Sequence, residues 1–86
     1  MASWRIEFAR SATKDLRGID RKWIPRIIAE IANLENNPRP DGCKKLVGSE
    51  HTYRIRNGDY RVIYDIQDEI LVVLIVRIRH RRDVYR

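Results

Sequence analysis

The sequence has few of the residues that form disulfides or metal sites. It holds one cysteine in 86 residues, Cys43, so no internal disulfide can form, which suits a reducing cytosol. His51 and His80 are its only histidines; with Cys43 they are too few to predict a zinc site, so we expect no metal and no cofactor. The longest apolar run, 70–76, is far too short to cross a bilayer, and residues 1–8 are too polar for a signal peptide. We expect a cytoplasmic protein without a membrane partner.

Positive charge is what the sequence has in excess. Its 18 lysines and arginines against 12 acidic residues give a formal net charge of +6 and an isoelectric point near 10.0. This balance favours a polyanionic partner such as nucleic acid, although many small proteins are basic for solubility alone. The short length, with no repeat and no long linker, predicts a single domain over residues 1–86.

Two helices are predicted in the N-terminal half. They follow a strand at 3–9, where apolar and polar residues alternate. Ser11 is a suitable N-cap for the first helix. The second helix is predicted from apolar residues at helical spacing between 24 and 34, with Pro25 in its first turn and an end before Pro38.

Three strands are predicted in the C-terminal half. Alternating segments at 51–56 and 60–66 flank Asn57-Gly58, the strongest short hairpin signal, because a type I′ turn needs positive φ at both central positions. The segment 70–78 is apolar almost throughout, as expected of a central strand covered on both faces. The order β-α-α-β-β-β predicts an α+β fold, with two N-terminal helices packed on a mostly antiparallel four-stranded sheet.

Three arginines are predicted to share one face of the hairpin. With a two-residue turn at 57–58, Arg56 pairs with Asp59 and Arg54 lies directly opposite Arg61. Like charges opposite one another destabilise a sheet, and Asp59 relieves only part of the repulsion. We therefore expect the cluster to bind an anion, and the planar guanidinium group suits phosphate. The alternative is a solvated sheet face whose arginines pair with acidic residues elsewhere.

A second basic cluster forms the C-terminal segment 77–86. His80 lies in it and is a candidate general base near neutral pH, although an ordinary surface histidine would fit as well. Tyr85 offers a flat ring for an unstacked RNA base, or else an anchor for the tail in the core. Further phosphate contacts are predicted at four basic residues, of which the lysine pair could equally be solvated: Lys44, Lys45, Arg79 and Arg82.

Parts of the sequence resemble a known family. The segment 53–64, Tyr-Arg-Ile-Arg-Asn-Gly-Asp-Tyr-Arg-Val-Ile-Tyr, resembles the central hairpin of toxins of the RelE/ParE superfamily, and the segment 80–86 resembles the tail of its RelE branch. The predicted order of elements agrees as well, so the resemblance extends over essentially the whole chain. The loop before the hairpin matches the same toxins at five positions: Pro38, Gly42, Lys45, Leu46 and Gly48.

The resemblance implies a function. Toxins of the RelE type enter the ribosomal A site and cleave the mRNA codon exposed there. A cognate, RelB-like antitoxin neutralises them, and the pair commonly represses its own operon, so operator DNA would be contacted only through the complex. The family's catalytic residues carry over to Arg54, Arg56, Arg61, Arg81 and Tyr85. The tail can be aligned in more than one way, which makes Arg79 and His80 alternatives.

The chain departs from the family pattern at two positions. The best-known member has lysines in place of Arg54 and Arg56, and an arginine, unlike a lysine, effectively never loses its proton. The general base would then be His80 or Tyr85, or catalysis would rely on electrostatics and positioning. Two other functions stay open. One is ParE-like inhibition of DNA gyrase, which the retained Arg61 and tail residues argue against; the other is an inactive homologue that only binds RNA or an antitoxin.

Overall fold

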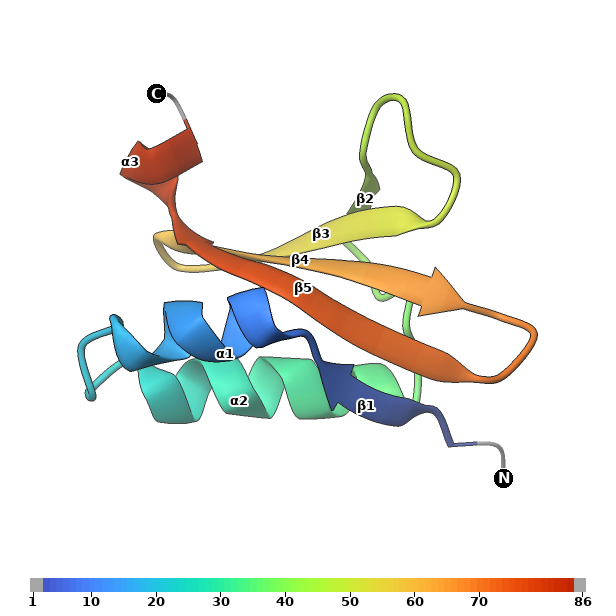
Figure 1. Cartoon of the computed structure of the whole chain (residues 1–86), viewed down its shortest axis with the longest axis horizontal. Helices are drawn as coiled ribbons and strands as arrows, with labels where there is room; N and C mark the ends of the chain where they lie inside the picture. The colour runs from blue at the N-terminus through green and yellow to red at the C-terminus, as the bar shows by residue number, and fades with distance from the viewer. Residues whose placement is uncertain (1–2, 85–86) are drawn as a thin grey trace.

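The computed structural model describes residues 3–84, which form a five-stranded sheet with two helices packed against one of its faces (Figure 1). The strands are β1 (Arg5–Phe8), β2 (Lys44–Lys45), β3 (Thr52–Asn57), β4 (Tyr60–Gln67) and β5 (Val72–His80), in the spatial order β1-β5-β4-β3-β2. The helices are α1 (Arg10–Arg17), α2 (Ile24–Ala32), the short 3-10 helix η1 (Asn33–Glu35) and α3 (Arg81–Val84).

The predicted α+β class and order of elements are confirmed, and the sheet has one strand more than expected. β1 runs parallel to β5, whereas all other neighbouring strands are antiparallel. The additional strand is β2, in which Lys44 lies opposite Arg54. Two residues are too few to show the period of a strand, so the alternation of apolar and polar residues could not predict β2.

The turn of the β3–β4 hairpin lies one residue later than predicted. Its two central residues are Gly58 and Asp59, and Asn57 pairs with Tyr60. Gly58 has a φ of +60°, whereas Asn57 and Asp59 both have negative φ. A positive φ at the first central residue alone is the pattern of a type II′ turn, which has glycine at that position.

This turn changes the pairing of the hairpin arginines. Arg61 lies opposite Arg56, and Arg54 lies opposite Ile63. The predicted pairs of Arg54 with Arg61 and of Arg56 with Asp59 are therefore wrong. The predicted common face is correct, because the pairing partner of Arg61 moves by two residues along β3 and every second residue of a strand points the same way.

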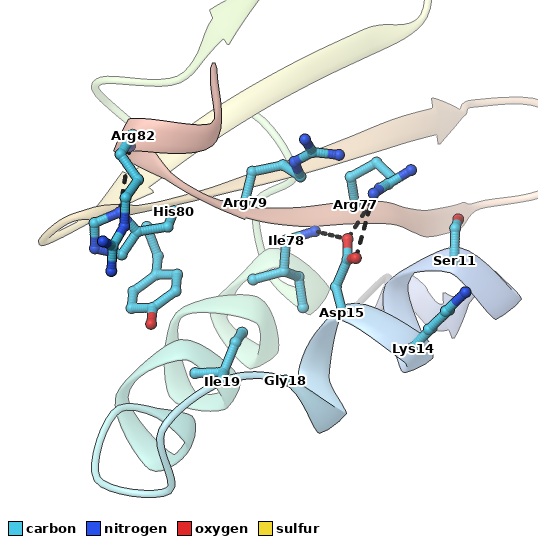
Figure 2. Close-up of a pocket in the computed structure, with 11 residues that line it drawn as sticks. Ser11, Lys14, Asp15, Gly18, Ile19, Arg77, Ile78, Arg79, His80 and Arg82 are labelled. Atoms are coloured by element: carbon cyan, nitrogen blue, oxygen red, sulfur yellow. Dashed lines mark hydrogen bonds and ion pairs between the residues drawn. The ribbon is translucent and has the colours of Figure 1, made fainter. Parts of the chain in front are cut away.

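α1 lies along the part of β5 that β1 leaves uncovered. β1 pairs with β5 only at residues 72–75. Beyond them, the Ser11 hydroxyl donates to the Val76 carbonyl at 2.6 Å, and the Asp15 carboxylate accepts the N–H of Ile78 at 2.9 Å (Figure 2). No side chain caps α1, so the cap predicted at Ser11 is wrong. The side chains of α1 instead satisfy backbone groups on an open edge of the sheet.

The hydrophobic core lies between the sheet and the helices. On one face of the sheet, Ile55, Val62 and Ile78 lie opposite one another on three neighbouring strands and are buried. They pack in one cluster with Ile27 and Ile31 of α2. The residues that alternate with them on β3, β4 and β5 therefore point away from the helices. None of the helices within residues 3–84 is long and apolar enough to cross a membrane.

The ends of the other elements differ slightly from the prediction. Pro25 lies in the first turn of α2, as expected. The last strand begins two residues late, because Ile70 and Leu71 belong to the β4–β5 turn, where Leu71 has a φ of 54°. β5 is an inner strand between β1 and β4, whereas the middle strand of the five is β4.

Candidate phosphate-binding site

Three arginines form a row across the centre of the sheet. Arg61 on β4 lies directly opposite Arg56 on β3 and directly opposite Arg79 on β5. Opposed residues of antiparallel strands point to the same face, and the adjacent Val62 and Ile78 point to the helices. This arginine row therefore occupies the face turned away from α1 and α2, where Figure 2 shows the Arg79 side chain.

Arg61 is the most firmly held member of the arginine row. Its strand, β4, is paired with β3 on one side and with β5 on the other. Its exposed fraction is 8%, and it is the only charged residue that is buried within residues 3–82. A side chain enclosed in this way on a rigid strand has few other positions available, so its guanidinium group is preorganised.

The tail is attached to the hairpin turn beside the arginine row. The N–H of Arg81 donates to the Asp59 carbonyl at 2.6 Å, and Arg81 Nη1 lies 3.9 Å from Asp59 Oδ1. A cavity of about 230 Å³ is lined by Arg56, Gly58, Asp59, Arg61 and Arg81. Three of the predicted arginines thus meet around one small cavity, and among the side chains of residues 3–82 Asp59 is the one carboxylate that lines it.

This arrangement suits an anion of the size of a phosphate group. Like charges on directly opposed strand residues repel one another, and an anion between them removes that cost. Arginine offers a planar fork of N–H donors that matches two oxygens of a phosphate at once. Because Arg56 and Arg61 come from neighbouring strands and Arg81 from the tail, the donors approach the cavity from different directions.

Lys44 and Arg54 extend the same face toward the β2 edge. Lys44 lies opposite Arg54, and both line a second cavity of about 210 Å³ together with Arg56. The residue opposite Arg54 on the central strand β4 is Ile63, so the pair of Lys44 and Arg54 has no arginine beside it on β4. Lys44 stays a candidate phosphate contact, whereas Lys45, the next residue of β2, points to the opposite face.

His80 does not join the arginine row. It lies on the helix-facing side of β5, where its ring meets the Tyr60 ring edge to face at a centroid distance of 5.1 Å. Its Nδ1 accepts the N–H of Arg82 at 3.2 Å (Figure 2). A neutral ring that accepts through Nδ1 carries its proton on Nε2 and offers a donor there. The structure thus separates the predicted base from the arginines by the thickness of the sheet.

The other predicted residues of the tail have different positions. Arg82 is exposed and lines a groove beside α1, and it does not line the cavity formed by Arg56, Arg61 and Arg81. Tyr85 lies outside the described residues, so its stacking role stays a prediction. Arg79, expected only as a further phosphate contact or an alternative to Arg81, is a full member of the arginine row. The pairing of β4 with β5 would have revealed it, but a single sequence does not specify that pairing.

Comparison with known proteins identifies the family of the chain. Residues 6–85 match the model of a family described as the ParE toxin of type II toxin-antitoxin system, parDE. The chain is 34% identical to Toxin RelG of Mycobacterium tuberculosis, over 96% of this chain and 97% of that protein. It is 32% identical to Toxin RelE3 of Methanocaldococcus jannaschii, over 94% of each.

Solved structures of toxins of this superfamily are also similar to the chain. The toxin–antitoxin complex RelBE2 from Mycobacterium tuberculosis matches with a TM-score of 0.76 and 30% identity, over 92% of this chain and 99% of that chain. The archaeal RelE–RelB complex from Pyrococcus horikoshii OT3 matches with a TM-score of 0.80 and 28% identity, over 92% of this chain and 96% of that chain. Fold and relatives together define the class of the protein, a toxin of a type II toxin–antitoxin system. The chain belongs to the RelE/ParE toxin superfamily, as its hairpin and tail indicated.

Proposed function

We propose that this toxin is a ribosome-dependent endoribonuclease that cuts mRNA in the ribosomal A site. The observation that carries the proposal is the arginine row, with the buried Arg61 at its centre and Arg81 attached beside it. Rigidly held N–H donors are most effective where negative charge increases during a reaction, as it does on a phosphodiester under attack. The RelE-type relatives support the same reaction class.

The proposed step is the attack of an RNA 2′-oxygen on the adjacent phosphorus. A new P–O2′ bond forms while the P–O5′ bond breaks, which leaves a 2′,3′-cyclic phosphate and a 5′-hydroxyl. The 2′-hydroxyl gives up its proton, and the leaving 5′-oxygen takes one up. Arg61, flanked by Arg56 and Arg79, stabilises the added charge on the pentacoordinate phosphorus. Arg81 donates a hydrogen bond to the leaving oxygen, which takes its proton from solvent. The step uses neither a metal nor a cofactor.

Electrostatics and positioning supply most of the rate in this proposal. The arginines effectively never lose a proton, and His80 lies on the other face of the sheet, so the 2′-hydroxyl proton passes to solvent. The ribosome holds the codon in line, which explains why activity on free RNA should be weak. Tyr85, carried over from the family resemblance, would stack on a codon base.

Expression of the toxin alone in bacteria should arrest growth and cut translated mRNA. The cleavage sites should lie in frame, because the ribosome presents one codon at a time. Mapping of mRNA 5′ ends before and after induction measures this result directly. Normal growth with confirmed soluble toxin and unchanged 5′ ends would refute the proposed function and leave a homologue that only binds RNA or an antitoxin.

The matched family model is that of the ParE toxin, and the resemblance to ParE-like toxins implies one other function, the inhibition of DNA gyrase. A gyrase inhibitor would arrest growth without cutting mRNA. Supercoiling of relaxed plasmid by purified gyrase, with and without the toxin, separates the two activities. We expect supercoiling to continue unchanged, since the arginine row offers donors for a phosphodiester. Inhibited supercoiling with intact mRNA would instead assign the chain to the ParE type.

A RelB-like antitoxin is the proposed protein partner. Several of the similar solved structures are toxin–antitoxin complexes, and a net charge of +6 on 86 residues complements an acidic segment. Affinity purification from the native host should recover a small protein encoded beside this chain, and its co-expression should restore growth. Recovery of ribosomes without any such protein would count against this partner. Operator DNA would be contacted through the complex.

A further inference from the structure

The arginine row continues over the edge of the sheet into a groove. This α1–β5 groove lies between α1 and the C-terminal half of β5 and has a volume of about 850 Å³ (Figure 2). Arg79 lines the groove and is also the last residue of the arginine row, so the two regions share a side chain. Lys14 on α1 and Arg82 on α3 add two more cations to its lining.

Within residues 3–82, the one carboxylate that lines the groove is Asp15, and it is already engaged. Asp15 binds Arg77 through two contacts, Nε–Oδ2 at 2.9 Å and Nη2–Oδ1 at 3.3 Å, and it also accepts the N–H of Ile78. Lys14 and Arg79 take part in none of the ion pairs found among the side chains of residues 3–82, and the same is true of Arg82. The groove therefore keeps an excess of positive charge.

α1 adds a basic stripe beside the groove. Arg10, Lys14 and Arg17 recur at intervals of four and three residues, so they lie along one side of the helix, and all three are exposed. Ser11 and Asp15 lie next to this stripe and bind β5. Positive charge thus extends from the arginine row, through Arg79, to the outer side of α1.

We propose that the α1–β5 groove binds the backbone phosphates of the RNA strand that crosses the arginine row. The strand would leave the row at Arg79, pass over the edge of β5 and run beside Lys14 and Arg17. Flexible cations around an open groove recognise phosphate charge and not base identity, so this contact is independent of sequence. The assignment of the strand as the cleaved message rests on the proposed function.

The test compares short and long RNA on purified toxin. Single-stranded RNAs of about four and about ten nucleotides, with 2′-O-methyl groups that prevent cleavage, are titrated by fluorescence anisotropy at several salt concentrations. The longer RNA should bind more tightly. In the double variant Lys14→Gln/Arg17→Gln this advantage should disappear, and the salt slope should fall by about 0.7 for each lost phosphate contact. The affinity for the short RNA should not change.

Arg5→Gln is the charge control. It removes one positive charge, where the double variant removes two, from an exposed side chain of β1 that pairs with Glu7, at the opposite end of α1 from the tail, and it should leave both affinities unchanged. Both residues of the double variant are exposed, and a thermal melt verifies that the variant is folded. Equal binding of both lengths by the unmodified toxin, or equal losses for both lengths in the double variant, would overturn the proposal.

Two other outcomes assign the groove to a different ligand. If the double variant binds both RNAs normally but loses affinity for purified ribosomes, the groove contacts ribosomal RNA and not the message. If it loses only antitoxin binding, the groove is a protein interface; either result overturns the proposal. A failure of the ribonuclease function would be seen in the mRNA 5′ ends and not in these binding curves, so the two failures are distinguishable.

Discussion

Replacement of Arg61 by alanine should lower the rate of mRNA cleavage by about a hundredfold or more and remove toxicity. Arg61 is buried on the central strand, between Arg56 and Arg79, and lines the cavity that Arg81 also lines. A donor held in this way needs little reorganisation when charge develops on the phosphate. The measurement is single-turnover cleavage of mRNA on ribosomes with an empty A site.

Variants at the two arginines of β3 provide the comparison. Arg56 is exposed, and Arg54 lies opposite Ile63, so alanine at either position should cost less than alanine at Arg61. Arg61→Lys should fall in between, because it keeps the charge and loses the planar fork. Antitoxin binding and a cooperative melt verify that each variant is folded. A folded, fully toxic Arg61→Ala together with an inert Arg56→Ala would show that the transition-state contact is assigned to the wrong residue.

The common face of the hairpin arginines could be predicted from the sequence, although their pairing could not. Asn57-Gly58 and Gly58-Asp59 are both good turn sequences, and the choice between them decides which residues lie opposite each other. The two pairings differ by two positions along β3, and a shift of two preserves the face of every side chain. A shift of one would have placed Arg61 among the core residues, where Val62 lies.

The place of Arg79, on β5, in the arginine row could not be predicted from the sequence. Between Ile63 and Tyr64 the β4–β5 pairing contains a bulge, so counting outward from the β4–β5 turn does not give the partner of Arg61. Arg79 and His80 are neighbours in a strand and must point to opposite faces. Which of them joins the arginine row depends on which face the helices cover, and this is a property of the tertiary fold.

A second large effect is expected at alkaline pH and concerns Tyr64. This residue has an exposed fraction of 0% on β4, the strand that also carries Arg61, and its hydroxyl donates to the Pro38 carbonyl at 2.7 Å. Burial, followed by the neighbouring Cys43, raises the pKa of Tyr64 well above the usual value for tyrosine. The folded protein therefore keeps this proton at a pH where the unfolded chain loses it.

The sign of the effect follows from this difference. The contribution of Tyr64 to stability is fully present below the unfolded pKa of about 10, and it is lost as the pH rises from there through the folded pKa. Within that window the free energy of unfolding should fall by up to about 1.4 kcal/mol for each pH unit because of this one group. Urea unfolding between neutral and strongly alkaline pH measures the fall.

The Tyr64→Phe variant should be less stable than the unmodified protein at neutral pH and more stable than it at strongly alkaline pH. At neutral pH the variant should be less stable by about 1 to 3 kcal/mol, because the Pro38 carbonyl loses its donor at a buried position. Above pH of about 10 the variant has no proton to lose at this site, so its stability should decline less steeply and the two curves should converge and cross. Parallel curves would mean that Tyr64 ionises as easily in the folded protein as in the unfolded chain, which its burial on the central strand argues against.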